Sequence, residues 1–318
     1  MTKIHNVTIV GAGLMGHGLA LVHALGECRV VMQDISAAQM DSAPKLIAVA
    51  LDTLIDGGAV KAGERDAVLA RISTEPDLTI AVGNADLVVE AVAEDIEIKR
   101  LVYSQIAEAA PDHALLASNT SHLDIFPLLP DTLKARSGIA HWYTPPYIID
   151  LVDLVGAPEA GPEVVETLRA LYAGMGKKPI VFAKFAPGYV ANRLQAALGL
   201  EIYHLLDSGI ATPEAIDDSI KYGLAARMAF LGHLKKADYT GLGLVQQIMS
   251  NAAYSPPPVR KQSPTIENLV GEGRLGVASG GGFFNYAERP PAEWFSARDR
   301  ALLKHKALVE KIEREDPM

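Results

Sequence analysis

The sequence has almost no cysteine, no surplus of positive charge and no long apolar run. Cys28 is the single cysteine among 318 residues, which excludes an internal disulfide and suits a reducing compartment. The formal net charge of −9 argues against nucleic acid or an anionic membrane surface as partner. No stretch approaches the roughly 18 uncharged apolar residues of a membrane span, and a predicted strand begins too early for a signal peptide. We therefore expect a soluble, cytoplasmic protein.

What the sequence does contain, at its start, is a glycine-rich turn between a predicted strand and a predicted helix. Residues 7–10 form an apolar run typical of a buried strand, and the glycines after it fit the pattern G-x-G-x-x-G. In that pattern the first glycine allows a tight turn, the second lets a pyrophosphate approach, and the third lets the helix pack on the strand. The N-terminus of the helix then favours phosphate.

An acidic residue follows at the spacing that this nucleotide-binding pattern requires. Asp34 ends the next predicted strand 18 residues after Gly16 (34 − 16 = 18), close to the spacing of about 20 for the acid that binds the adenine ribose. A mere tight turn would rarely carry that acid, and a carboxylate there would repel the 2′-phosphate of NADP. The pattern predicts an NAD site formed by Gly11, Gly13, Leu14, Met15, Gly16 and Asp34.

The order of the remaining elements predicts an α/β domain followed by an all-helical one. Strands are expected at residues 85–92, 115–118, 138–143, 151–155 and 179–182, alternating with helices at 94–110 and 162–175. Alternation of this kind indicates a Rossmann-type, doubly wound, mostly parallel sheet. A helical hairpin at about residues 36–72 is an insertion. We place a domain boundary after residue 185, where a long apolar helix begins at 186–188, so that residues 186–318 form the second domain.

Polar residues stand at unusual places in or after three predicted elements. Residues 118–121 (Ser-Asn-Thr-Ser) follow a strand end, where an open α/β sheet binds ligands, and we expect Asn119 to face the cofactor. His141 lies in one apolar strand and Asp153 in another, and a buried carboxylate needs a partner. We expect the two to pair, which would leave one ring nitrogen for proton transfer. Each of these residues also has an ordinary structural explanation, as a helix cap or a buried polar group.

Five motifs together resemble the L-3-hydroxyacyl-CoA dehydrogenase family over nearly the whole chain. They are G-A-G-L-M-G, D-L-V-V-E-A-V-A-E, S-N-T-S, A-H-W-Y-T-P-P and P-G-Y-V-A-N-R. The resemblance implies NAD-dependent oxidation of a 3-hydroxyl group by a homodimer formed through the helical domain. It implies that His141 is the catalytic base, that Ser121 and Asn192 bind the reacting oxygen, and that Glu94 and Lys99 lie on the cofactor side.

The sequence departs from that family at two positions and in one segment. Asp153 stands where the family has a glutamate that orients the histidine, and Thr144 replaces an asparagine. Residues 223–232 resemble instead the branch that acts on free hydroxy acids, such as L-gulonate 3-dehydrogenase (lambda-crystallin) and carnitine dehydrogenase. In this segment Arg227 is suited to grip a substrate carboxylate through two parallel bonds, although a surface arginine is an equal explanation.

These observations predict an NAD-dependent dehydrogenase that oxidises the 3-hydroxyl group of a small hydroxy acid and uses no metal. One alternative is a 3-hydroxyacyl-CoA substrate, whose phosphates the hairpin cations Lys61, Arg65 and Arg71 would bind. Another is a non-catalytic NAD(H)-binding or structural, crystallin-like protein, which the changes at Asp153 and Thr144 keep open. A relative of the 6-phosphogluconate or 3-hydroxyisobutyrate dehydrogenases is disfavoured, because these use a catalytic lysine in the helical domain where this chain has Asn192.

Overall fold

The computed structural model describes residues 4–251 and 255–317 of a chain that folds as two compact units. The first unit ends at Tyr189 and the second begins at Val190. The segment just before the boundary is bonded to the first unit, since the Gly188 amide donates to the Ser121 carbonyl and Tyr189 is buried. Each unit is described by itself.

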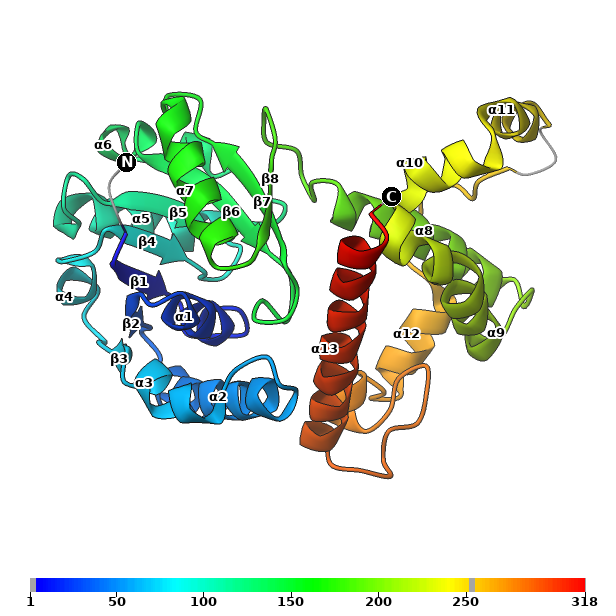
Figure 1. The fold of residues 1–318 in the computed structure, drawn as a ribbon, viewed down its shortest axis with the longest axis horizontal. Coiled ribbons are helices and arrows are strands. Elements are labelled where there is room, and N and C mark those ends of the chain that lie inside the picture. Colours follow the sequence, from blue (N-terminus) through cyan, green and yellow to red (C-terminus); the bar gives the residue numbers. More distant parts are fainter. Residues whose placement is uncertain (1–3, 252–254, 318) are drawn as a thin grey trace. The chain divides into compact units, whose positions relative to one another are not determined.

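An eight-stranded sheet forms the centre of the first unit (Figure 1). Its order is β3-β2-β1-β4-β5-β6-β7-β8, and every neighbouring pair is parallel except β6 with β7. This is the mostly parallel, Rossmann-type sheet predicted from the sequence. The strands are β1 (Asn6–Val10), β2 (Arg29–Gln33), β3 (Ile72–Thr74), β4 (Leu87–Glu90), β5 (Leu115–Ser118), β6 (Ser137–Trp142), β7 (Leu151–Gly156) and β8 (Lys178–Val181).

Helices and short 3-10 turns connect these strands. Side chains cap several of them: the Ser36 hydroxyl accepts from the Gln39 amide at the start of α2, and Asp95 caps α5. The helical elements are α1 (Gly16–Leu25), α2 (Ala37–Asp56), η1 (Ala62–Glu64), α3 (Arg65–Leu69), α4 (Leu78–Val82), α5 (Ile96–Ala109), η2 (Phe126–Leu128), α6 (Asp131–Lys134) and α7 (Pro162–Gly174).

The second half of the helical hairpin differs from the sequence-based expectation. The hairpin was expected to be helical to about residue 72, but its helical part ends at Leu69 and Ile72 begins the edge strand β3. Ile72 pairs with Val30 of β2. A strand of three residues is too short to show an alternating pattern, which is why the sequence did not reveal it.

In the part of the second unit that the structure describes, the regular elements are helices, and the only β structure is a set of isolated bridges near Gly281. Its first helix starts at Ala191 rather than near 186, because Gly188 (φ +76°) and Tyr189 (φ +49°) are in the left-handed region, which no right-handed helix can include. The Thr212 side chain caps α9, and a π-helix that contains Gly223 connects α9 to α10. The elements are α8 (Ala191–Asp207), α9 (Pro213–Asp218), η3 (Ser219–Ala225), α10 (Ala226–Thr240), α11 (Leu242–Ser250), α12 (Pro264–Gly271), η4 (Val277–Ser279) and α13 (Pro291–Glu315).

Two further properties bear on where and how the protein works. Within residues 4–251 and 255–317, no helix has both the length and the apolar content needed to cross a membrane. Cys28 is buried, and this burial is the main reason that the pKa of its thiol rises to about 11. A thiol in that state is protonated at neutral pH and is a poor nucleophile.

Candidate active site

The glycine turn after β1 has the steric constraints that the sequence pattern predicts. Gly11 has φ +102°, and a Cβ there would lie 2.6 Å from the Ala91 carbonyl oxygen. A Cβ on Gly16, the first residue of α1, would collide with the Gly11 carbonyl oxygen. By contrast nothing lies within 4 Å of a Cβ built on Gly13. The turn is therefore closely packed at Gly11 and Gly16 and open at Gly13, next to the N-terminus of α1. This leaves the space that a pyrophosphate requires.

Asp34 follows β2 and is tied to this turn. Its Oδ2 accepts a hydrogen bond from the Ala12 amide at 2.8 Å, and its Oδ1 accepts one from the Ser36 amide at 2.8 Å. The two bonds fix the carboxylate beside the glycine turn, at the carboxyl end of the strand where the ribose-binding acid of a Rossmann domain lies.

A cleft of about 340 Å³ lies over the open side of the turn. It brings together residues of α5 and of the loops that follow β1, β4 and β5, which are far apart in the sequence. Six predicted cofactor-side residues and Ser121 line it: Gly13, Leu14, Met15, Glu94, Lys99, Asn119 and Ser121. An open glycine turn, a helix N-terminus and a fixed carboxylate fit NAD, and the pyrophosphate would lie against Gly13 with the ribose at Asp34.

Glu94 organises the loop that follows β5. One carboxylate oxygen, Oε1, accepts from the Thr120 hydroxyl and from the amides of Ser121, His122 and Leu123 at 2.7–3.1 Å. Burial alone would raise the pKa of Glu94, but these hydrogen bonds outweigh it and lower the pKa to about 2. Glu94 is therefore ionised at neutral pH, and it positions Ser121 through that residue's backbone.

Lys99 lines the cleft, but its ammonium group is bound to a carboxylate that the sequence analysis did not single out. The Lys99 Nζ is 2.6 Å from Oε1 of Glu90, which is fully buried at the end of β4. The Tyr103 and Ser118 hydroxyls donate to Oε2 of Glu90 at 2.7 and 2.6 Å. The signal for this network was a glutamate at the end of an apolar strand, which needs a countercharge when buried.

His141 and Asp153 meet as predicted, because they occupy directly opposed positions of the antiparallel pair β6–β7. Their Nδ1 and Oδ2 atoms are 3.2 Å apart, and both side chains are buried. Tyr143 also donates its hydroxyl to Oδ2 of Asp153, at 2.6 Å. The His141 ring stacks on the Tyr189 ring at 4.9 Å. A carboxylate at Nδ1 leaves Nε2 as the nitrogen that can exchange a proton with a ligand.

Two contacts join this pair to the cofactor side of the first unit. Asn119 accepts a hydrogen bond from the Trp142 amide through its Oδ1 at 2.9 Å, next to His141 in the chain. The Thr144 hydroxyl lies 3.1 Å from the Met15 sulfur, so Thr144 contacts the glycine turn. Asn192 and Arg227 stand near the starts of α8 and α10 in the second unit, so this geometry includes neither of them.

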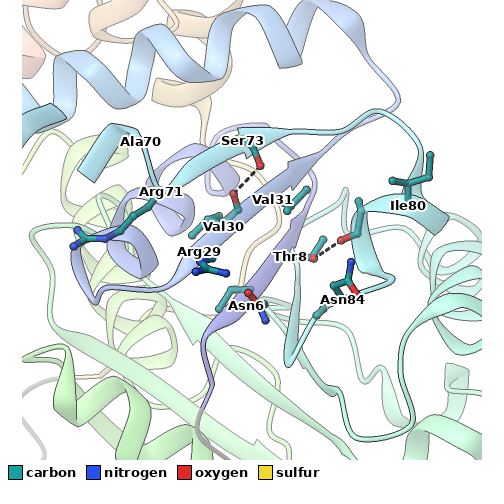
Figure 2. A pocket seen from close by; sticks show the side chains of 13 residues that line it. Asn6, Thr8, Arg29, Val30, Val31, Ala70, Arg71, Ser73, Ile80 and Asn84 are labelled. Atoms are coloured by element: carbon teal, nitrogen blue, oxygen red, sulfur yellow. Dashed lines mark hydrogen bonds between the residues drawn. The ribbon is translucent and has the colours of Figure 1, made fainter. Parts of the chain in front are cut away.

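Another cavity, of about 400 Å³, lies at the opposite ends of the strands (Figure 2). It is lined by the first residues of β1 and β2, with Arg29, Arg71 and Asn84 around it. Polar groups in its wall bond to the backbone, as in the bond from Ser73 to the Val30 carbonyl. Open parallel sheets bind their ligands at the carboxyl ends of the strands, so this cavity is not the candidate site. Among the described residues, no cluster of metal-ligating side chains is suited to hold an ion.

Comparisons with known proteins agree with this geometry. The family model for the NAD binding domain of 3-hydroxyacyl-CoA dehydrogenase matches residues 6–185, and that for its C-terminal domain matches residues 188–286. The chain is 30% identical over 308 residues to 5-formyl-3-hydroxy-2-methylpyridine 4-carboxylate 5-dehydrogenase of Mesorhizobium japonicum, covering 96% of this chain and 99% of that protein. A crystal structure of a dehydrogenase of that name, described as an NAD+ dependent dismutase, superposes with a TM-score of 0.86 at 29% identity, covering 97% of this chain and 99% of that one.

Two human proteins are related at a similar level. Mitochondrial hydroxyacyl-coenzyme A dehydrogenase is 30% identical over 291 residues, which are 89% of this chain and 91% of that protein. The lambda-crystallin homolog is 33% identical over 241 residues, 75% of this chain and 76% of that protein. Relatives at about 30% identity thus come from several branches, and none of them assigns this chain to a branch. The chain belongs to the 3-hydroxyacyl-CoA dehydrogenase family and is an NAD-dependent dehydrogenase that acts on a CH–OH group.

Proposed function

We propose that this dehydrogenase oxidises the 3-hydroxyl group of a small, free hydroxy acid to the ketone, with His141 as the base. The observation that carries the proposal is the buried His141–Asp153 pair. Trp142, next to His141 in the chain, donates its amide to Asn119, which lines the cleft of the glycine turn. The Nε2 atom of His141 accepts the hydroxyl proton, and Asp153 stabilises the imidazolium that forms. Bound NAD supplies the hydride acceptor. Ser121, and Asn192 as the resemblance implies, bind the reacting oxygen while charge gathers on it.

Two observations favour a free acid over a CoA thioester. The dehydrogenase from M. japonicum, related over nearly its whole length, is named for a substrate that is a free carboxylate. Two of the three hairpin cations that could hold CoA phosphates are bound within the protein: Arg65 pairs with Asp52 at 2.6 Å, and Arg71 donates to the Ala24 carbonyl. A CoA ester is the second candidate, because several relatives, the human mitochondrial enzyme among them, are named for hydroxyacyl-coenzyme A.

A substrate screen tests this proposal. Purified protein is mixed with NAD and with free 3-hydroxy acids or their CoA thioesters, and NADH is followed by absorbance. We expect turnover of at least one free acid, and its loss in His141→Asn, since a general base contributes about 10² to 10⁴ in rate. Efficient oxidation of 3-hydroxybutyryl-CoA with no free acid accepted would favour the CoA ester. NAD binding without turnover of any compound in either class would contradict the proposal.

Arg227 is proposed to bind the carboxylate of the free acid. Its Nε donates to the Gly223 carbonyl at 3.1 Å, a bond within one helical turn that sets the direction of the side chain. Arg227→Met should raise the KM for the acid by one to two orders of magnitude, equal to about 1.5–3 kcal/mol for a charged hydrogen bond. Lys221→Met is the control, because that exposed cation is paired with Asp217. An unchanged KM in Arg227→Met would exclude the role.

We also propose that the second unit forms a homodimer. Among its described residues the buried apolar side chains are only Ile216 and Leu303, whereas several large ones are exposed on α8, α10 and α11. Patches of this kind mark protein interfaces. The exposed set includes Leu194, Leu198, Leu234, Leu242, Ile248 and Met249. Light scattering should give twice the chain mass of 33.9 kDa, and a monomer at all concentrations would contradict the proposal.

A further inference from the structure

Tyr143 makes the shorter of two hydrogen bonds to the same oxygen of Asp153. Its hydroxyl is 2.6 Å from Oδ2, whereas Nδ1 of His141 is 3.2 Å from that atom. Charge-assisted O–H···O⁻ bonds are about 2.5–2.7 Å long, so the tyrosine bond has the length of a strong one. The histidine contact is at the long end of the range for nitrogen donors. The Asp153 carboxylate is therefore held more firmly by the tyrosine than by the histidine.

The ring of Tyr143 also confines the ring of His141. The two centroids are 4.7 Å apart at an interplanar angle of 71°, and Tyr189 stacks on His141 at 22°. Tyr143 stands two positions after His141, directly beyond the end of β6. Side chains two positions apart along a strand point to the same face, so both reach Asp153 on β7.

Tyr143 is a permanent donor at this place. Burial raises the pKa of its hydroxyl above the ordinary value of 10, and the hydrogen bond to Asp153 and its negative charge raise it further. The hydroxyl therefore keeps its proton throughout the pH range of a dehydrogenase assay.

We propose that Tyr143 is a positioning residue: its hydroxyl fixes the Asp153 carboxylate so that Oδ2 faces Nδ1 of His141. The proton of the neutral imidazole is then held on Nδ1, and Nε2 stays free to accept the proton of the substrate. The inference rests on the proposed role of His141 as the base. Without the hydroxyl, one long contact would have to fix a carboxylate that rotates about two side-chain bonds.

Tyr143→Phe tests the proposal because it keeps the ring and removes only the hydroxyl. With a substrate found in the screen, we expect kcat to fall about tenfold, equal to about 1.4 kcal/mol, with the KM for substrate and for NAD within about twofold. In an Asp153→Asn background the same change should have almost no further effect, because the hydroxyl acts through the carboxylate. A raised KM at constant kcat, or two effects that multiply, would overturn the proposal.

A second measurement, of the His141 tautomer, does not depend on turnover. It can therefore test the role of Tyr143 even if the proposed function is wrong. The ring nitrogens of His141 are observed by ¹⁵N NMR at a pH at which the signals of the neutral imidazole dominate, and are assigned by comparison with His141→Asn. Tyr143→Phe should lower the share of the Nδ1-protonated tautomer. Tyr172→Phe is the control, since its buried hydroxyl has no hydrogen-bond partner among the described residues. Unchanged His141 shifts in Tyr143→Phe would refute the positioning role.

Discussion

Two buried carboxylates of the same sheet are surrounded very differently. Glu90, at the end of β4, accepts four hydrogen bonds of 2.6–2.9 Å, two on each oxygen, and one of the donors is the ammonium of Lys99. Asp153, on β7, has the Tyr143 and His141 contacts on a single oxygen, and the histidine contact is long. Both carboxylates are almost completely shielded from solvent.

The difference indicates what each carboxylate does. A buried charge with a full set of donors and a countercharge is locked in place, and its removal disrupts the fold. In the proposed reaction Asp153 faces instead a ring whose charge changes, so its environment must tolerate both charge states of that ring. We therefore expect changes around Glu90 to alter stability and changes around Asp153 to alter turnover.

The largest effect is expected when the countercharge of Glu90 is removed. Lys99→Met leaves a buried carboxylate without its cation and should lower the free energy of unfolding of the first unit by about 3–5 kcal/mol. Unfolding in urea can be followed through Trp142 fluorescence in a Trp294→Phe background, because the sequence has two tryptophans and Trp294 lies in the second unit.

The neighbouring position on α5 supplies a matched control for this experiment. Arg100 pairs with Glu97 at 2.7 Å, but both side chains are more than half exposed. Arg100→Met should change the free energy of unfolding by less than about 0.5 kcal/mol. Equal losses in the two variants would mean that the Glu90 network does not stabilise the first unit as proposed.

At Asp153 we expect a smaller effect, and we expect it on kcat and not on stability. Asp153→Asn keeps a side chain that can bond to His141 but removes the charge that stabilises the imidazolium, and we expect kcat to fall about 10- to 100-fold. The midpoint of urea unfolding should stay near that of the wild type, because few bonds depend on this carboxylate. If Asp153→Asn unfolded at a much lower urea concentration while its folded fraction kept the wild-type kcat, Asp153 would serve stability and not turnover.

The smallest effect is expected from the loss of one donor at Glu90. Tyr103→Phe removes the hydroxyl that bonds to Oε2, but the Ser118 hydroxyl still donates to that oxygen. The free energy of unfolding should fall by about 1 kcal/mol with kcat unchanged. Tyr103→Phe and Tyr143→Phe each remove one tyrosine hydroxyl, the first at Glu90 and the second at Asp153. We expect the first change to lower stability and the second to lower turnover. A drop in kcat in Tyr103→Phe would show that the two sites are not separate.

The features that the sequence predicted are those that local sterics or short sequence separations determine. Gly11 and Gly16 could be assigned because a side chain at either would collide with backbone, and the His141–Asp153 contact could be expected because strands close in sequence often pair. Lys99 was expected to serve the cofactor through the resemblance, but its partner Glu90 becomes evident only when α5 packs beside β4.

Other features could not be predicted from the sequence pattern, because they depend on the backbone conformation of one residue or on a hydrogen bond of one side-chain atom. The start of α8 shifted because Tyr189 is left-handed, which nothing in its side chain signals. The hydroxyl of Tyr143 was passed over because an aromatic residue near a strand end first suggests packing, and only the distance to Asp153 shows the bond.

The register of β6 and β7 also constrains how this pair can be inherited. His141 and Asp153 are 12 positions apart and lie directly across from each other. A single residue inserted into either strand would turn its half of the pair to the opposite face of the sheet. When relatives recombine and both breakpoints lie outside this stretch, the histidine and the carboxylate are inherited together. A breakpoint between them joins a histidine from one ancestor to a carboxylate from another. Natural chimaeras should therefore have their junctions outside residues 141–153.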